Sequence, residues 1–372
     1  MTILENAPTS VESTALKEIF DANRFRAIAR EIVTISPSFD AERFLELALA
    51  GLDELSLMQR LRRMTESLHA TLPADYHEAL AILRQLAPQI QHSFVTLALS
   101  DYVGLYGLED FATSLDALKF FTTFGSSEFA VRQYLRHDLS RTLAVMETWS
   151  RDENEHIRRL ASEGSRPRLP WSFRLDALVA DPSPVATILE NLKADSSLYV
   201  RKSVANHLND ITKDHPLWVM DRIKSWPLEN PHTAWIAKRA LRTLIKKGDQ
   251  RALALIGAGE KPQVMVHDFL LQPREIALGD RIHFSFRLAS NSPTPQRLVI
   301  DYIVHYVKKS GGTSAKVFKL KELTLNPGES ILITRSQNIR DFTTRVHYPG
   351  RHTVEVVING ESLAMAFFDL AL

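Results

Sequence analysis

Basic residues recur at comparable positions in four segments of helical pattern, and they are the first candidates for chemistry in this 372-residue chain. The segments FAVRQYL, HIRRLASE, YVRKSVANH and WIAKRALRTL each place a cation after an apolar residue. These cations are Arg132, Arg158, Arg201 and Lys238, separated by 26, 43 and 37 residues, near the length of a HEAT-type helix pair. In a stacked array they would align along one concave face and could hold a nucleic acid duplex. The alternative is that each pairs with a carboxylate of the adjacent repeat.

The charge distribution also favours a polyanionic partner. The formal net charge is +1, but the first 116 residues hold 9 Lys and Arg against 17 Asp and Glu. Residues 117–260 hold 22 against 17, and residues 265–372 hold 13 against 10. An acidic first third followed by a basic remainder suggests that a polyanion binds the later surfaces. Ordinary variation of surface charge would give the same counts.

Common catalytic motifs are absent from the sequence. The chain has no cysteine, and it has no phosphate-binding glycine loop, HExxH or Gly-x-Ser-x-Gly motif. Its 13 histidines are not clustered: His207 and His215 are too far apart along the chain for a metal-ligand spacing. We therefore expect neither a metal site nor a cofactor, and any catalysis would come from carboxylates, tryptophan and backbone groups.

Helical periodicity predicts that residues 1–260 form an array of paired helices. Apolar residues recur at helical spacing from Val11 to Ala258, and most prolines and glycines fall between the runs. Short loops make neighbouring helices antiparallel, as in a HEAT-like repeat. The run RPRLPW at 166–171 breaks the pattern, because its two prolines prevent a continuing helix. Asp214 is expected to cap a helix that begins near Pro216.

The pattern changes after a linker at 258–262, and residues 264–372 predict an all-β, immunoglobulin-like sandwich. Apolar and β-branched residues alternate there between turn signals. Strands are expected at 264–271, 281–289, 298–307, 315–325, 330–339 and 353–363. The hairpin Lys308-Lys309-Ser310-Gly311-Gly312 is small and basic, so it could reach a groove of DNA or be an ordinary exposed turn.

No stretch of the sequence is apolar and long enough for a membrane span, so no membrane partner is expected. Residues 1–13 are polar and mildly acidic, unlike a signal peptide. These features are typical of a cytoplasmic protein of a bacterial kind.

Four runs of residues give a specific resemblance. They are SEFAVR at 127–132, NEHIRRLASEG at 154–164, RPRLPW at 166–171 and VRKSVANHLND at 200–210. The chain resembles the DNA alkylation repair glycosylases of the AlkC type, closely over residues 115–257 and more loosely before them. One subgroup of that family carries an Ig-like domain after the helices, in agreement with the sandwich expected here.

The resemblance implies an enzyme of base excision repair. Such glycosylases hydrolyse the N-glycosidic bond of cationic alkylated bases in duplex DNA, especially 3-methyladenine and 3-methylcytosine, without full extrusion of the base. The family's site residues match Glu128, Glu163, Asp210 and Trp171. A cationic base leaves without a general acid, so carboxylates would stabilise the developing positive charge on the sugar. We assign water activation to Asp210, electrostatic stabilisation to Glu128 and Glu163, and an aromatic contact to Trp171.

Each of these four residues also has an ordinary structural interpretation. Asp210 could be a helix cap, and Glu163 could be a solvated helix terminus. Glu128 near a helix start could simply favour the positive end of the dipole. Trp171 could be a core residue, as is expected of Trp149 and the other tryptophans.

Candidate phosphate contacts are the basic residues of the matching runs and of the sandwich hairpin. They are Arg158, Arg159, Arg166, Arg168, Arg201, Lys202, Lys308 and Lys309. The expected protein is a monomer that binds alkylated duplex DNA and associates with the bacterial nucleoid when bound. The competing hypothesis is a non-catalytic HEAT-repeat scaffold for DNA or protein.

Overall fold

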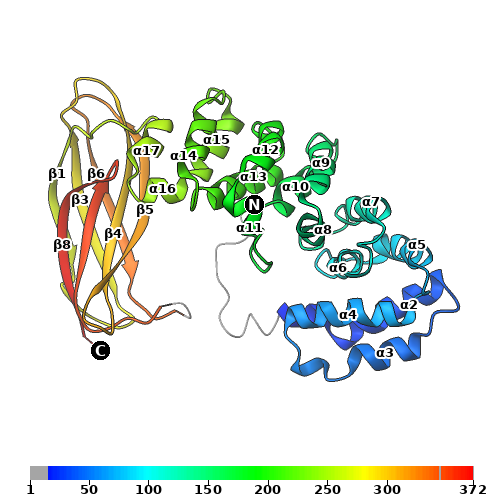
Figure 1. Cartoon of the computed structure of the whole chain (residues 1–372). Helices are drawn as coiled ribbons and strands as arrows, with labels where there is room; N and C mark the ends of the chain where they lie inside the picture. The colour runs from blue at the N-terminus through cyan, green and yellow to red at the C-terminus, as the bar shows by residue number, and fades with distance from the viewer. Residues whose placement is uncertain (1–15, 343–344, 372) are drawn as a thin grey trace. The chain divides into compact units, whose positions relative to one another are not determined.

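The computed structural model describes residues 16–342 and 345–371, and the expectations for residues 1–13 lie outside this part of the chain. Within it, α-helices are followed by a β-sandwich, which confirms the predicted fold class (Figure 1). The α-helices are α2 (Ala22–Ile35), α3 (Ala41–Leu49), α4 (Leu57–Thr71), α5 (Tyr76–Leu86), α6 (Leu97–Tyr106), α7 (Phe111–Phe121), α8 (Val131–His137), α9 (Leu139–Trp149), α10 (Glu155–Gly164), α11 (Asp176–Ala180), α12 (Ala186–Leu192), α13 (Leu198–Ile211), α14 (Pro216–Lys224), α15 (Pro231–Ala240), α16 (Arg242–Lys246) and α17 (Gln250–Leu255). Short 3₁₀ turns lie at Glu18–Phe20, Leu52–Glu54, Ala87–Gln89 and Ser183–Val185.

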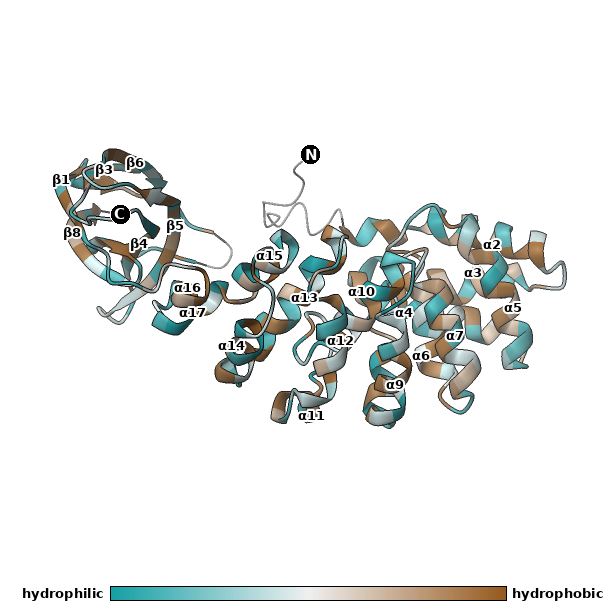
Figure 2. Cartoon of the chain, turned by 90° about the horizontal axis from the view of Figure 1, so that it is seen from above, coloured by the Kyte–Doolittle hydropathy of each residue, from teal (hydrophilic) through white to brown (hydrophobic). Residues whose placement is uncertain are grey.

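The first of two compact units contains the described residues up to His215 together with Glu229–Ile236. Its helices form two layers of a helical repeat. In one layer α4 packs on α6, α6 on α8, and α10 on α13; in the other, α5 packs on α7 and α9 on α12. Most of these helices present a hydrophobic and a hydrophilic side (Figure 2). None of the helices in the described part of the chain is long and apolar enough to cross a membrane.

Helices α10 and α13 matter most for the site, and their sequences fix where they begin and which faces they bury. The Asn154 side chain accepts a hydrogen bond from the His156 N–H at the start of α10, and Ser197 caps α13 in the same way. Apolar residues at Val200, Val204 and Leu208 then form one buried stripe along α13. The two helices pack on each other, so side chains distant in sequence are brought together.

The second unit contains Pro216–Leu228 and the described residues from Ala237 onward. It therefore joins α14, the end of α15, α16 and α17 to the sandwich. The change from helix to strand falls after α17, but the division between the packing units runs through α15. The domain limits 1–260 and 264–372 stay a prediction based on secondary structure.

The sandwich consists of a three-stranded and a five-stranded sheet, seen end-on in Figure 2. Its strands are β1 (Val264–Gln272), β2 (Glu275–Ala277), β3 (Arg281–Ser290), β4 (Gln296–Val307), β5 (Thr313–Leu325), β6 (Ser330–Asn338), β7 (Gly350–Ile358) and β8 (Glu361–Ala371). The order is β1-β3-β6 in one sheet and β2-β8-β7-β4-β5 in the other, antiparallel except for β2 with β8. Alternate residues of β3, such as Phe284 and Phe286, point into the shared core.

The predicted strand at 353–363 is wrong. The segment contains the end of β7, a two-residue turn at Asn359-Gly360 and the start of β8. Both turn residues have positive φ, 47° and 82°, as a tight hairpin of matching twist requires. Apolar residues on both sides of this Asn-Gly pair made the segment resemble one continuous strand. The short strand β2 was also missed.

Candidate active site at the end of helix α10

Three carboxylates far apart in sequence meet in one chain of ion pairs. The Arg159 guanidinium donates to Glu128 Oε2, and its Nη2 lies 3.7 Å from Glu163 Oε1. Arg166 Nη1 donates to Glu163 Oε1 at 2.6 Å, while its Nε and Nη2 reach Asp210 Oδ2 at 2.8 and 2.7 Å. The two arginines thus link a residue before α8, a residue of α10 and a residue of α13.

Burial makes these charges interdependent. Glu163 and Asp210 are 6% and 4% exposed, and Arg166 is 7% exposed. Burial opposes the charged form of Arg166, but the neighbouring Glu163 and Asp210 outweigh it and raise the pKa of the guanidinium. The same balance, with Glu128 and Glu163 as partners, raises the pKa of Arg159. Lys213 Nζ adds a third cation, 3.3 Å from Asp210 Oδ1, so the three carboxylates are balanced by two guanidiniums and one ammonium.

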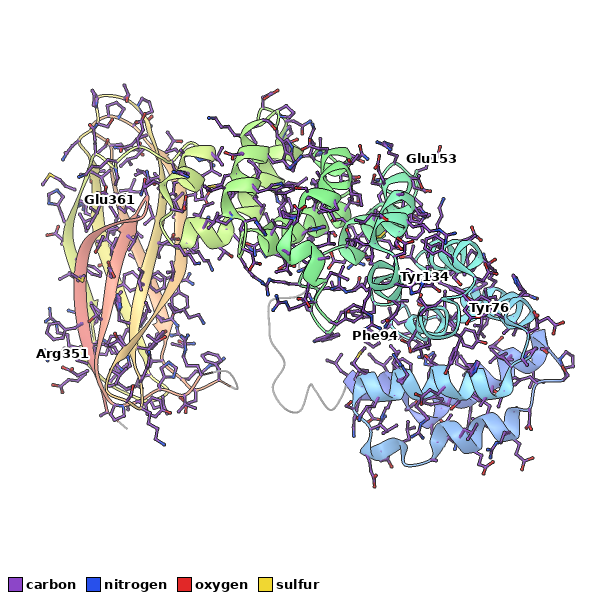
Figure 3. The ribbon with its side chains drawn as sticks, in the orientation of Figure 1. Tyr76, Phe94, Tyr134, Glu153, Arg351 and Glu361 are labelled. Atoms are coloured by element: carbon purple, nitrogen blue, oxygen red, sulfur yellow. The ribbon has the colours of Figure 1, made fainter. Side chains whose placement is uncertain are left out.

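A cleft of about 390 Å³ opens over this chain of ion pairs. Glu128 and Glu163 line it, whereas Asp210 lies behind Arg166 and does not. Its aromatic lining comes from Trp171, Tyr199, Phe94 and Phe129. Arg159 lies over the Tyr199 ring at 4.8 Å, and Phe94, labelled in Figure 3, meets Trp171 edge-to-face at 6.4 Å. A concave site with carboxylates and aromatic faces can bind a planar or cationic group and stabilise positive charge.

Trp171 has the geometry of a binding residue. Its side chain is 68% exposed, whereas Trp149 and Trp226 are 3% and 4% exposed. Its φ is 65°, a left-handed conformation that costs a residue with a side chain about 1–2 kcal/mol. The structure therefore excludes a core role for Trp171. Strain combined with exposure of a large apolar side chain is typical of functional sites.

Arg132 holds the loop that carries Trp171. Its side chain is fully buried, and Nη1 donates to the carbonyls of Gly164 at 3.0 Å and Arg166 at 2.6 Å. Nη2 donates to the carbonyl of Phe173, whose ring also lies 5.4 Å from the guanidinium. Both ends of the 165–173 loop are thus bound to one side chain. Burial and the nearby Arg166 lower the Arg132 pKa to about 10, which leaves it charged at neutral pH.

Comparison with known proteins agrees with this geometry. Residues 58–246 match the family model for DNA alkylation repair enzymes, and residues 265–372 match the C-terminal Ig-like domain of the uncharacterised protein YhaZ. The chain is 46% identical to YhaZ of Bacillus subtilis over 347 residues, which cover 93% of this chain and 96% of the relative. The chain belongs to the DNA alkylation repair enzyme family.

A solved structure extends the agreement to nearly the whole chain. Pseudomonas fluorescens alkylpurine DNA glycosylase AlkC, bound to DNA containing an abasic site analogue, is 59% identical with a TM-score of 0.93. The match covers 96% of this chain and 99% of that one. These findings confirm the resemblance to AlkC and the Ig-like domain, and the homology supports a glycosylase of alkylation repair.

The ordinary interpretations of Asp210 and Glu163 do not fit their surroundings, whereas Glu128 does lie just before α8. Asp210 lies in the last turn of α13 and accepts from Arg166, so it is not an N-cap. Glu163 is buried rather than solvated. Glu128 accepts from Ser126 Oγ at 2.8 Å as well as from Arg159. Asp214, expected to cap a helix, instead accepts the guanidinium of Arg168 at 2.8 Å.

The predicted row of surface cations is wrong for Arg132, which is buried. Arg158 instead follows the alternative, because it makes a two-bond pair with Asp195 of the next repeat at 2.7 and 3.1 Å. Arg201 donates to the carbonyls of Asp195 and Ser196, and Lys238 pairs with Glu322 within the second unit. The sequence shows that these residues are basic but not which acceptor satisfies them.

The proposed phosphate contacts fall into two groups. Five arginines are engaged inside the protein: Arg158, Arg159, Arg166, Arg168 and Arg201. Lys202, Lys308 and Lys309 are exposed, without an ion pair in the described part of the chain. Sequence reasoning also missed Tyr199 and Phe94. Tyr199 lies one residue before the matching run at 200–210, where the pattern indicates only an apolar helix residue, and Phe94 lies in a segment without clear periodicity.

The strained φ of Trp171 predicts that a glycine variant at this position is more stable than an alanine variant, which reverses the usual order. Trp171→Ala and Trp171→Gly both remove the indole, but only glycine adopts a φ of 65° without a steric penalty. We expect the glycine variant to be more stable than the alanine variant by about 1 kcal/mol. Urea denaturation of the two variants measures the difference. An alanine variant as stable as the glycine variant would mean that the backbone here is unstrained.

The Arg132 contacts predict a local loosening of the loop. Lysine keeps the charge of Arg132 but cannot reach three carbonyls as the planar guanidinium does. Arg132→Lys should therefore speed amide hydrogen exchange in residues 165–175 while the α2–α5 region keeps its protection. Arg136→Lys is the control, because Arg136 lies over the same Phe173 ring at 4.8 Å and binds no loop carbonyl. Equal exchange in both variants would remove the proposed role.

Proposed function

We propose that this protein is a DNA glycosylase that releases cationic alkylated bases, chiefly 3-methyladenine and 3-methylcytosine, from duplex DNA and so starts base excision repair. We also propose that it acts without turning the base fully out of the helix. The observation that carries the proposal is the meeting of Glu128, Glu163 and Asp210 beside the exposed Trp171. Membership of the alkylation repair family and homology to AlkC support it.

The carboxylates suit the bond that must break. An alkylated base that already carries a positive charge leaves as a neutral molecule, so no group needs to protonate it. The barrier lies in the positive charge that develops on the deoxyribose, as in glycosidases. Glu128 and Glu163 line the cleft and are held by the arginines, so they can stabilise that charge without rearranging.

Asp210 is the proposed group that orients and deprotonates the attacking water. The two hydrogen bonds that Arg166 donates to Asp210 both end at Oδ2, which fixes the direction of the carboxylate. Oδ1 faces the Lys213 ammonium at 3.3 Å, and the Lys213 side chain is 48% exposed. Oδ1 is the oxygen that Arg166 does not bind, and we propose that the attacking water reaches Asp210 there, beside the Lys213 ammonium.

Aromatic residues would hold the lesion against the carboxylates. A cationic base is attracted to the face of an indole or phenol ring, and Trp171 and Tyr199 supply both. Tyr199 already lies against the Arg159 guanidinium, so its ring position is fixed in the free protein. Trp171 projects further and would contact the stacked bases.

We propose duplex DNA as the partner, on the basis that the homologous AlkC structure is a complex with DNA. Lys202, Lys308 and Lys309 are proposed to bind phosphates, because they are exposed and unpaired in the described residues. The five engaged arginines would position backbone and carboxylates unless DNA displaces their partners. We also propose that the protein acts as a monomer. DNA repair would place it at the bacterial nucleoid.

The decisive experiment is release of methylated bases from duplex DNA treated with a methylating agent. We expect the pure protein, in buffer with a chelator, to release 3-methyladenine and 3-methylcytosine, which chromatography identifies. DNA binding without release of either base would favour the alternative, a helical-repeat scaffold. No feature of the site favours that alternative, since a scaffold does not need a strained, exposed tryptophan beside buried carboxylates.

An experiment can distinguish water activation by Asp210 from a purely electrostatic role of this carboxylate. General base catalysis contributes about 10²–10⁴-fold, so Asp210→Asn should lower the single-turnover excision rate by that factor. Azide needs no deprotonation and should restore part of the lost rate if Asp210 activates water. Asp214→Asn, which also changes an arginine-bound aspartate near the same helix end, is the control and should keep its rate. An Asp210→Asn rate that azide does not raise would assign Asp210 a purely electrostatic role.

The lysine hairpin can be tested through the salt dependence of binding. Each phosphate contact contributes about 0.9 to the slope of log K against log salt concentration for B-DNA. Replacing Lys308 and Lys309 together by alanine should lower that slope by roughly 1–2 and weaken binding at low salt most strongly. Lys321→Ala, an exposed change on β5 of the same sandwich, should leave the slope unchanged. Identical slopes for all three proteins would make the hairpin an ordinary turn.

A further inference from the structure

A second cavity adjoins the first at Trp171. It encloses about 180 Å³ between α4, α6, α8 and residues 171–173. The two cavities share part of their lining, including Phe129 and Trp171. Trp171 therefore lines both the cleft that contains the carboxylates and a smaller cavity that the proposed chemistry does not use.

The polar groups of this cavity differ in kind from those of the first. Its charged lining residues are Arg62 and Asp101, which neutralise each other through two bonds, Nε to Oδ2 at 2.9 Å and Nη2 to Oδ1 at 3.0 Å. Burial raises the pKa of Asp101, and Arg62 opposes that effect. The pair is thus a charge-balanced group held in one orientation, with no excess of carboxylate to attract a cation.

Two hydrogen-bond donors stay available beside this pair. The two bonds to Asp101 use Nε and Nη2 of Arg62, so Nη1 is left toward solvent on a side chain that is 43% exposed. Gln133 accepts from Arg136 through Oε1, and its Nε2 has no partner in the described part of the chain. Arginine and glutamine donors of this kind recognise the edges of nucleobases.

The apolar lining suits a flat ligand. Phe129 and Trp171 contribute aromatic rings, and Met58 and Leu97 complete the walls. Aromatic side chains bind unstacked bases without regard to sequence, because every base has a π-face. The cavity is too small for a nucleotide with its phosphate, but a single base could enter from a strand that Trp171 has parted.

We propose that this cavity is a second subsite that holds a neutral nucleobase of the DNA, while Trp171 separates that base from the lesion. The proposal rests on the function proposed above, because it requires a duplex opened at the site. The base is either a neighbour of the lesion in the same strand or the base opposite it. A neighbouring base and an opposite base offer the same chemistry to the subsite, and the duplexes used in the test distinguish between the two.

The test combines protein variants with missing bases. Met58→Trp fills the cavity from a partly exposed position, and Gln133→Leu removes its amide donor. Binding is measured to a duplex with one abasic-site analogue at the lesion position. Three further duplexes each carry a second analogue, at the 5′ neighbour, the 3′ neighbour or the opposite position. Gln85→Leu, on α5 and outside the cavity, is the control.

We expect Met58→Trp to weaken binding to the first duplex about ten-fold, and Gln133→Leu to weaken it several-fold. Both effects should vanish for the one duplex that lacks the base bound in the subsite. In that duplex no base would enter the cavity, so filling the cavity or removing its amide donor costs no binding. That duplex identifies the base. Equal weakening with all four duplexes, or wild-type binding by both variants, would overturn the proposal. Release of methylated bases by the wild-type protein is scored separately, so a functional glycosylase with unaffected variants refutes the subsite alone.

Discussion

The site depends on the neutralisation of buried carboxylates by two arginines. Glu163 and Asp210 could not stay charged at this depth without partners, since an isolated buried charge costs several kcal/mol. Arg166 serves both of them, and Arg159 links Glu163 to Glu128. The pairs add little to stability in themselves, because their attraction mainly offsets desolvation. What they provide is a fixed set of anions close to a solvent-filled cleft.

That arrangement requires the backbone of the 165–173 loop to be held as well. Arg166 follows Gly164, the last residue of α10, by two positions. A Cβ added at Gly164 would lie 2.5 Å from a methyl group of Val131. Because α8 and α10 approach closely at Gly164, the Arg132 side chain on α8 can reach the loop carbonyls. One face of α8 thus fixes the peptide from which Arg166 and Trp171 project. The strained φ of Trp171 is tolerated because the residues around it are held at both ends of the loop.

The sequence was informative where chemistry follows from residue type and local pattern. The helix periodicity, the change to alternating strands and the motif residues Glu128, Glu163, Asp210 and Trp171 could all be found in it, although their roles stay proposals. It was misleading where the partner of a side chain decides its role. Arg159 and Arg166 looked like phosphate ligands because they are basic and lie in matching runs. Besides the nearby Glu163, they pair with Glu128 and Asp210, which are 31 and 44 residues away, and no local pattern records those distances.

The same interactions explain how such a site would choose its substrate. No group near the cleft is placed as a general acid: the carboxylates of the chain accept hydrogen bonds from guanidiniums, and His207 is fully buried with its pKa lowered by burial to about 3. A neutral damaged base would have to leave as an anion, and the Glu128 and Glu163 carboxylates that line the cleft would oppose it. A cationic base leaves as a neutral molecule, and the same carboxylates stabilise the sugar cation behind it. Under the proposed function, selection for alkylated cations would follow from the charges of the site, without a pocket that measures the shape of the lesion.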